Sequence, residues 1–133
     1  MNEIVVVSVV APFFLFVICV GGSLLLAQRR NAELVKHSPG VLPYTWGFFL
    51  GYSGIIGGLF TAAAGGVLAV VGLYQPWFLI VLAYLVLMGI ASYGVLTRRR
   101  WGWMFHIPLS LNPALWAFNS IYAGNRWREI QRQ

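Results

Sequence analysis

Four polar side chains stand out in this sequence because they interrupt an otherwise apolar stretch in its last third. They are His106, Ser110, Asn112 and Asn119. Polar groups at membrane depth are costly to bury, and they are commonly functional. We expect them either to hydrogen-bond neighbouring helices or to line a polar groove that binds an ion, a lipid headgroup or the transmembrane helix of a partner.

Residues typical of enzymes and metal sites do not accompany these side chains. The chain contains no Asp, and its Glu residues, Glu3, Glu33 and Glu129, all fall outside the apolar stretches. His106 could be an axial haem ligand, but the remaining histidine, His37, lies in a polar segment and cannot provide a second ligand at that depth. We therefore predict a non-enzymatic protein without a metal site or a cofactor.

The composition indicates a membrane protein. Of 133 residues, 59% are hydrophobic and 9% are charged, whereas soluble domains carry roughly a quarter charged residues. The formal charge of +6 comes from basic clusters beside apolar spans, where arginines face the cell interior and meet anionic lipids. This placement argues against a nucleic-acid partner. Cys19 is the single cysteine and lies in an apolar run, so no disulfide framework is expected.

These patterns predict an all-α, polytopic integral membrane protein with one transmembrane domain and four helical segments. The expected spans are residues 4–27, 44–73, 78–96 and 102–123, with a basic loop at 28–43 and a short basic tail at 125–133. The first three runs are long enough to cross a hydrocarbon core of about 30 Å. Arg29 and Arg30 after the first span, and Arg98–Arg100 after the third, place those ends inside and the N-terminus outside. Residues 74–77 then form an outer turn.

The last segment allows two arrangements because Pro108 and Pro113 break it. In the arrangement that we prefer, residues 101–124 cross the membrane as a fourth, broken helix. This leaves the basic tail, including Arg126 and Arg132, outside and against the charge rule. In the other, the segment is a re-entrant hairpin or an interfacial helix, and every basic residue stays inside. Asn112 followed by Pro113 is a typical helix start in either case.

Small residues recur every four positions in the second span, at Gly54, Gly58, Ala62 and Gly66. Such rows let helix backbones approach closely in membranes. The row either packs within the bundle or forms a contact with a second copy or another subunit. The triplet Arg98, Arg99 and Arg100 is expected to contact lipid headgroups in addition to setting the topology.

Together these features predict a small helical subunit or binding partner within a membrane assembly, possibly as a homo-oligomer. Its contacts would be the Gly54–Gly66 row and the polar groove near Asn112 and Asn119, and its expected partners are membrane lipids and a membrane subunit. Two alternatives remain: a small channel or transporter whose pathway passes His106, Asn112 and Asn119, and an immunity protein against a toxin. The bacterial inner membrane is the expected location.

Overall fold

The computed structural model describes residues 3–72 and 75–130. Within those ranges the chain is all-helical, at 84% helix with no strands. Three of the described helices provide stretches that are long and apolar enough to cross a membrane, Val10–His37, Thr45–Val70 and Phe78–Leu96. The prediction of an all-α membrane protein is confirmed to this extent. Tyr74 of the predicted outer turn and Arg132 of the predicted tail lie outside the described residues.

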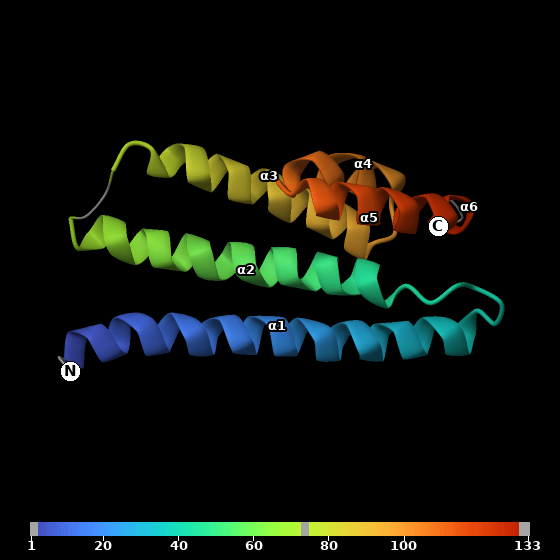
Figure 1. Cartoon of the computed structure of the whole chain (residues 1–133), viewed down its shortest axis with the longest axis horizontal. Coiled ribbons are helices and arrows are strands. Elements are labelled where there is room, and N and C mark those ends of the chain that lie inside the picture. The colour runs from blue at the N-terminus through green and yellow to red at the C-terminus, as the bar shows by residue number, and fades with distance from the viewer. Residues whose placement is uncertain (1–2, 73–74, 131–133) are drawn as a thin grey trace.

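The three long helices are α1 (Glu3–His37), α2 (Thr45–Val70) and α3 (Phe78–Leu96). They alternate in direction and lie side by side, with α2 in contact with both α1 and α3 (Figure 1). Large apolar side chains cover their outer faces; Phe16 is 66% exposed and Ile80 is 74% exposed. Contiguous apolar surface of this kind is typical of a surface that contacts membrane or protein.

Helix α1 is longer than the sequence suggested, since residues 28–37 continue the helix where we expected a loop. Most of these residues favour helix, and the next Pro and Gly after Gly22 are Pro39 and Gly40. Arg30 and Glu33 form an ion pair at 3.5 Å one turn apart, but both side chains are well exposed, so this contact adds little stability. The connection to α2 is therefore short, from Ser38 to Tyr44.

The remainder forms α4 (Arg100–Leu109), α5 (Pro113–Asn125) and the single turn α6 (Trp127–Ile130). The break falls between Pro108 and Pro113, where the sequence placed it. Leu111 takes a left-handed conformation with φ 51° at the turn. Asn112 then caps α5, because its side-chain oxygen accepts hydrogen bonds from the amides of the next turn at 3.0 and 3.4 Å.

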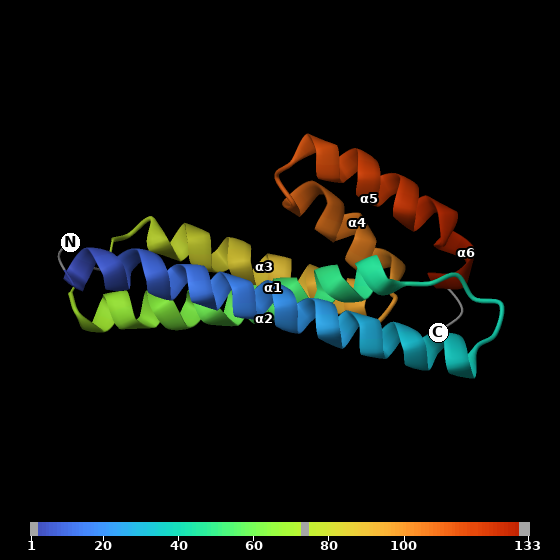
Figure 2. The same ribbon diagram turned by 60° about the horizontal axis from the view of Figure 1, so that its bottom comes forward.

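Helices α4 and α5 form a hairpin in which the end of α5 returns to the side where α4 starts (Figure 2). The Arg100 guanidinium donates a hydrogen bond to the Trp127 carbonyl at 2.9 Å, so the two ends of the segment meet. With 10 and 13 residues, the helices are about 15 and 20 Å long, shorter than a hydrocarbon core of about 30 Å. The structure thus does not show the fourth crossing that we preferred, and the end of α5 returns to the basic end of the bundle.

A close contact between two glycines allows α4 to fold back along α3. A Cβ atom added to Gly102 would collide with the backbone of Gly94 and of Val95, and one added to Gly94 would collide with Gly102 in return. Only glycine permits helix backbones to approach this closely. These two residues therefore make the sharp reversal after α3 sterically possible.

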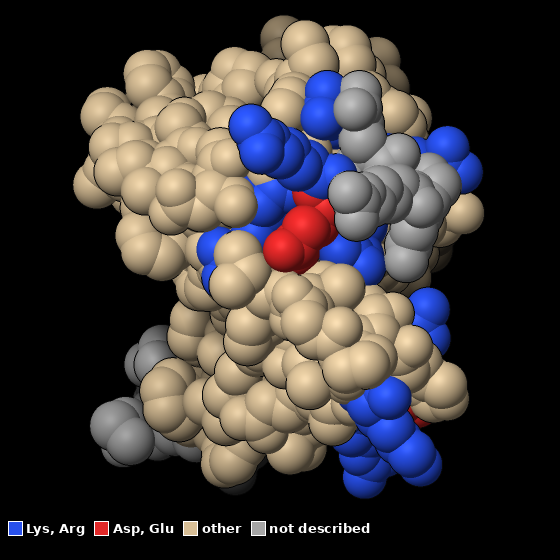
Figure 3. Space-filling model, turned by 90° about the vertical axis from the view of Figure 1, so that its right-hand side faces the viewer, with Lys and Arg blue, Asp and Glu red and all other residues tan. Residues whose placement is uncertain are grey.

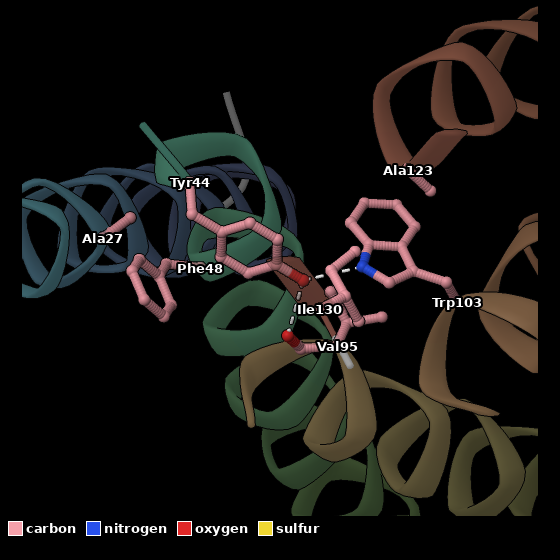
Figure 4. Packing of buried hydrophobic residues seen from close by; sticks show 7 residues of the cluster. All are labelled: Ala27, Tyr44, Phe48, Val95, Trp103, Ala123 and Ile130. Carbon is pink, nitrogen blue, oxygen red and sulfur yellow. Dashed lines mark hydrogen bonds between the residues drawn. The ribbon is translucent and has the colours of Figure 1, made fainter. Parts of the chain in front are cut away.

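The buried core lies at the end of the bundle where the basic residues gather, not along the long helices. Figure 4 shows the side chains of this core, which come from α1, the start of α2, the end of α3 and the α4–α6 segment. Its members are Ala27, Tyr44, Phe48, Val95, Trp103, Ala123 and Ile130. The best-packed part of the molecule is thus also its most highly charged end.

Candidate functional site

The basic end carries a layer of arginines and aromatic rings above the apolar helices. Seen from this end, Lys and Arg side chains surround an acidic side chain in the upper part, and a second basic group lies at the bottom, over the end of α1 (Figure 3). Three guanidinium groups lie over aromatic rings at 3.9–5.4 Å: Arg98 on Tyr44, Arg100 on Trp127 and Arg126 on Tyr122. Such contacts are attractive, because the ring faces are electron-rich.

Tyr44 joins three elements at the centre of this layer. Its hydroxyl donates to the Val95 carbonyl at 2.9 Å and accepts a hydrogen bond from Trp103 Nε1 at 2.6 Å (Figure 4). The two side chains are 1% and 0% exposed, respectively. Burial raises the pKa of the Tyr44 hydroxyl, which therefore stays protonated and available as a donor. Tyr44 thereby fixes the start of α2 against the end of α3 and the start of α4.

The C-terminal end of the chain is held to the loop between α1 and α2. Arg126 Nε donates to the Pro43 carbonyl at 2.9 Å. The amide of Leu42 donates to the Glu129 carboxylate at 3.2 Å. Glu129 and the basic side chains around it therefore share one surface with residues 38–44, which places the described C-terminal residues beside the predicted inner loop.

Arg98 holds a special position within the predicted arginine triplet. It follows α3 in a left-handed conformation with φ 57°. Its amide bonds the Val95 carbonyl at 3.0 Å, and the amide of Arg99 bonds the Gly94 carbonyl at 2.8 Å. This pair of bonds defines a helix C-terminal motif in which glycine usually occupies the position of Arg98. A residue other than glycine in this left-handed conformation costs about 1–2 kcal/mol. Arg98 therefore occupies this position despite backbone strain.

The Arg98 side chain is also only 5% exposed. Within the described part of the chain, its Nε atom has no hydrogen-bond partner. A buried N–H group without a hydrogen-bond partner is costly. The other two arginines behave differently, because Arg99 is exposed and Arg100 bonds and stacks on Trp127. Of the three arginines expected to contact lipid headgroups, only Arg98 combines burial with an unused donor.

Arg98 lines a pocket between α1, α2 and the turn after α3, with a cavity volume of about 620 Å³. We call it the basic-end pocket. Leu34, Phe48 and Tyr52 give it an apolar lining, whereas Arg30 and Arg98 contribute cations. A pocket with both kinds of lining suits a ligand that has an anionic group joined to an apolar part.

A second cavity, of about 430 Å³, is an apolar groove between α2 and α3. We call it the α2–α3 groove. Three small residues line it, Gly58, Ala62 and Gly89. The larger Leu59 and Val86 also line it and are 67% and 54% exposed. The groove therefore combines an accessible backbone with projecting apolar side chains.

The predicted glycine row divides between two environments. A Cβ atom on Gly54 would collide with the Ser92 side chain, so this glycine belongs to the packing of α2 on α3. At Gly58 the nearest atom would be the Leu85 carbonyl oxygen at 3.9 Å, and at Gly66 nothing lies within 4 Å. The row thus serves internal packing at Gly54 and faces open space further along α2.

Two of the four predicted polar residues, His106 and Asn119, are buried. Asn119 is 0% exposed, and its side-chain oxygen accepts a hydrogen bond from Trp46 Nε1 at 2.8 Å. His106 is 2% exposed and lies next to the Trp103 ring. Each retains one buried nitrogen with no hydrogen-bond partner among the described residues, Nδ1 of His106 and Nδ2 of Asn119. Asn119 thereby connects α5 to the start of α2, whereas the neighbour given for His106, Trp103, lies on the same helix α4.

The other two residues, Ser110 and Asn112, act at the tip of the hairpin. The Ser110 hydroxyl donates to the Ile107 carbonyl at 2.7 Å, and Asn112 caps α5. Neither the basic-end pocket nor the α2–α3 groove is lined by any of the four predicted residues. The structure therefore does not gather them in either cavity.

Sequence reasoning missed the residues that build the basic-end pocket around Arg98. Arg30 had been assigned only to topology, and the apolar lining residues Leu34, Phe48 and Tyr52 had been assigned no role. The one available signal was that aromatic residues lie close to each arginine cluster in the sequence. This proximity does not tell which arginine contacts which ring. As for metals, the described residues contain no group of three His, Cys, Asp or Glu side chains placed to hold an ion.

The groups of this end can hold an anion or fix an interface, since they offer cationic donors, aromatic faces and a mixed pocket. Comparison with known proteins adds no further constraint on these possibilities. No family model, curated protein or solved structure matches the chain.

Proposed function

We propose that this protein is a non-enzymatic membrane subunit that associates with a second copy of itself through the α2–α3 groove. The observation that carries the proposal is the open groove lined by Gly58, Ala62 and Gly89. Lipid tails are as apolar as the groove, so a partner must gain its binding energy from close packing, which small residues permit. The groove follows two membrane-spanning helices, which favours a helix as its occupant.

A second copy fits the groove better than an unrelated helix because the same patch carries both halves of a contact. Leu59 and Val86 project from the borders of the groove while Gly58 leaves room beside them. A two-fold symmetric contact requires such a self-complementary surface, with each copy supplying ridge and groove. The remaining members of the glycine row, Ala62 and Gly66, would continue the contact along α2.

The test is the oligomeric state of the full chain in lipid nanodiscs or mild detergent, measured by native mass spectrometry. We expect dimers for the wild type and monomers for Gly58→Leu, because leucine would fill the groove. Gly57→Leu is the matched control, because Gly57 has nothing within 4 Å of an added Cβ and does not line the groove. A monomeric wild type, or dimers that persist in Gly58→Leu, would refute the proposal.

We further propose that the α4–α5 hairpin is re-entrant and enters the membrane from the basic side. Its surface is apolar, including Leu111 at the tip, which is 73% exposed. Irregular backbone at membrane depth needs partners within the protein. Tyr84, in the first half of α3, supplies one by donating a hydrogen bond from its hydroxyl to the Leu109 carbonyl at 2.6 Å.

This topology leaves the basic loop, the Arg98–Arg100 triplet and Arg126 on the inner side, in agreement with the positive-inside rule. We propose the bacterial inner membrane as the location, with the N-terminus outside. The non-enzymatic part of the proposal rests on the sequence, whose acidic residues lie outside the apolar spans.

The transport alternative receives less support. Its pathway would pass His106, Asn112 and Asn119, yet Asn112 is used as a helix cap and Asn119 bonds Trp46. Ion flux into liposomes that contain the purified protein separates the two functions, because an assembly subunit alone produces none.

A further inference from the structure

Arg98 has three properties that folding alone does not account for. Its backbone is in the left-handed region at φ 57°, its side chain is 5% exposed, and its Nε has no hydrogen-bond partner within the described ranges. Strained residues that persist in a structure are commonly part of a functional site. The groups around Arg98 should therefore indicate which kind of ligand its guanidinium contacts.

The charges around the basic-end pocket leave a cation free to bind an anion. Glu33 lies at the rim, but its carboxylate is paired with Arg30 at 3.5 Å and is 64% exposed. His37 also lines the pocket, and its Nδ1 is 2.8 Å from the Glu33 carbonyl oxygen. Among the described residues, no carboxylate lies within salt-bridge distance of Arg98. Arg98 and Arg30 together thus outweigh the single acid at the rim.

The lining of the pocket further restricts the ligand. Leu34, Phe48 and Tyr52 present apolar surface beside the two arginines. These residues belong to α1 and α2, at the end where the chain leaves the apolar spans. A free inorganic anion would leave this lining unused, whereas a lipid would place its phosphate at the arginines and its acyl chains against the apolar wall.

We propose that the basic-end pocket binds one anionic phospholipid, whose phosphate is held by Arg98 and Arg30. The guanidinium group suits this role because its planar set of donors matches phosphate oxygens. The ligand would supply the missing hydrogen-bond partner of the buried Arg98 Nε. The site is independent of the α2–α3 groove, so either proposal can fail without the other.

The purified full chain is tested by native mass spectrometry and thermal unfolding in detergent, with phosphatidylglycerol or phosphatidylcholine carrying identical acyl chains. Glycerol phosphate serves as the soluble probe with the same charged group and no chains. We expect one retained phosphatidylglycerol, a raised unfolding temperature with this lipid alone, and weaker binding of glycerol phosphate.

The decisive variant is Arg98→Gly, because glycine is the favoured residue at this position of the helix end. It should fold at least as well as the wild type without lipid, and its affinity for phosphatidylglycerol should fall about tenfold or more, as expected for the loss of a hydrogen-bonded charge. Arg30→Gln should weaken binding to a smaller degree. Arg99→Gln removes the same charge from the neighbouring exposed residue and should bind as the wild type does.

Three results would overturn the proposal. The first is equal binding of phosphatidylglycerol and phosphatidylcholine, which would remove the role of the charge. The second is glycerol phosphate that binds as tightly as the lipid, which would make the site one for soluble phosphates. The third is an equal loss of binding in Arg99→Gln and Arg98→Gly. If Arg98→Gly does not fold, the comparison of Arg30→Gln with Arg99→Gln decides between these outcomes.

Discussion

Replacing Tyr44 by phenylalanine removes one oxygen atom from a fully buried pair of hydrogen bonds and leaves the ring packing in place. In the wild type this oxygen accepts from Trp103 Nε1 at 2.6 Å and donates to the Val95 carbonyl at 2.9 Å. The substitution affects the hydrogen bonding of the two partners differently. The Val95 carbonyl keeps its bond from the Arg98 amide at 3.0 Å, whereas the indole N–H of Trp103 loses its partner.

The expected cost follows from this difference. An unsatisfied buried donor costs about 1–3 kcal/mol, whereas a carbonyl that retains one partner loses much less. Trp103 is 0% exposed, so water cannot replace the lost oxygen without repacking. We therefore expect Tyr44→Phe to lower the free energy of unfolding by about 1–3 kcal/mol.

The assay is reversible unfolding in mixed micelles of increasing dodecyl sulfate content, followed by circular dichroism. Tyr122→Phe is the matched control, because its hydroxyl reaches the Pro43 carbonyl only at 3.4 Å in an exposed contact. It should stay within about 0.5 kcal/mol of the wild type. A double-mutant cycle with Trp103→Phe should give a coupling of about 0.5–3 kcal/mol. Equal stabilities of Tyr44→Phe and the wild type would refute the assigned role of this pair.

Three further predictions concern the α4–α5 hairpin and Tyr44. Gly102→Ala should destabilise the fold by about 1–3 kcal/mol, because the added Cβ would collide with the backbone of Gly94 and Val95. Gly124→Ala should stabilise α5 by up to about 1 kcal/mol, because the space around Gly124 is open. Thermal unfolding measures both effects. Asn112→Ala should cost about 1 kcal/mol and Asn112→Ser much less, since serine still caps the helix. Burial raises the pKa of Tyr44 in the folded state, so the unfolded state releases the proton first. The contribution of Tyr44 to the free energy of unfolding is therefore present below about pH 10 and is lost as pH rises further. Tyr44→Phe should show a flatter decline of stability in an alkaline titration.

The sequence was sufficient to predict the helical class and the three long apolar helices, because length and apolarity in a membrane are local properties. It also predicted the break before Pro113, since Asn followed by Pro is a local helix-start signal. The extent of α1 was mispredicted because we treated the polar stretch from Gln28 to His37 as a loop. Charged residues are good helix formers, and a membrane helix can continue into water.

The direction of the last segment was not predictable because it depends on a contact between distant residues. Gly94 and Gly102 permit α4 to fold back, and neither glycine differs in the sequence from others that face open space, such as Gly57. The polar groove stays a prediction, and the partners of its residues were unpredictable for a similar reason. Polar residues in an apolar segment identify buried hydrogen bonds, but the sequence does not say that Asn119 meets Trp46 or that Asn112 caps its own helix.

The most direct test of the account is the side of the membrane on which the C-terminal segment lies. With Cys19 replaced by serine, single cysteines are introduced as Lys36→Cys at the basic end of α1, Gln75→Cys before α3 and Arg128→Cys in α6, and are labelled in intact cells with a reagent that does not cross the membrane. The re-entrant hairpin predicts that position 128 stays protected together with position 36, while position 75 reacts from outside. Labelling of position 128 together with position 75 would mean that residues 101–124 cross the membrane, which would contradict the account.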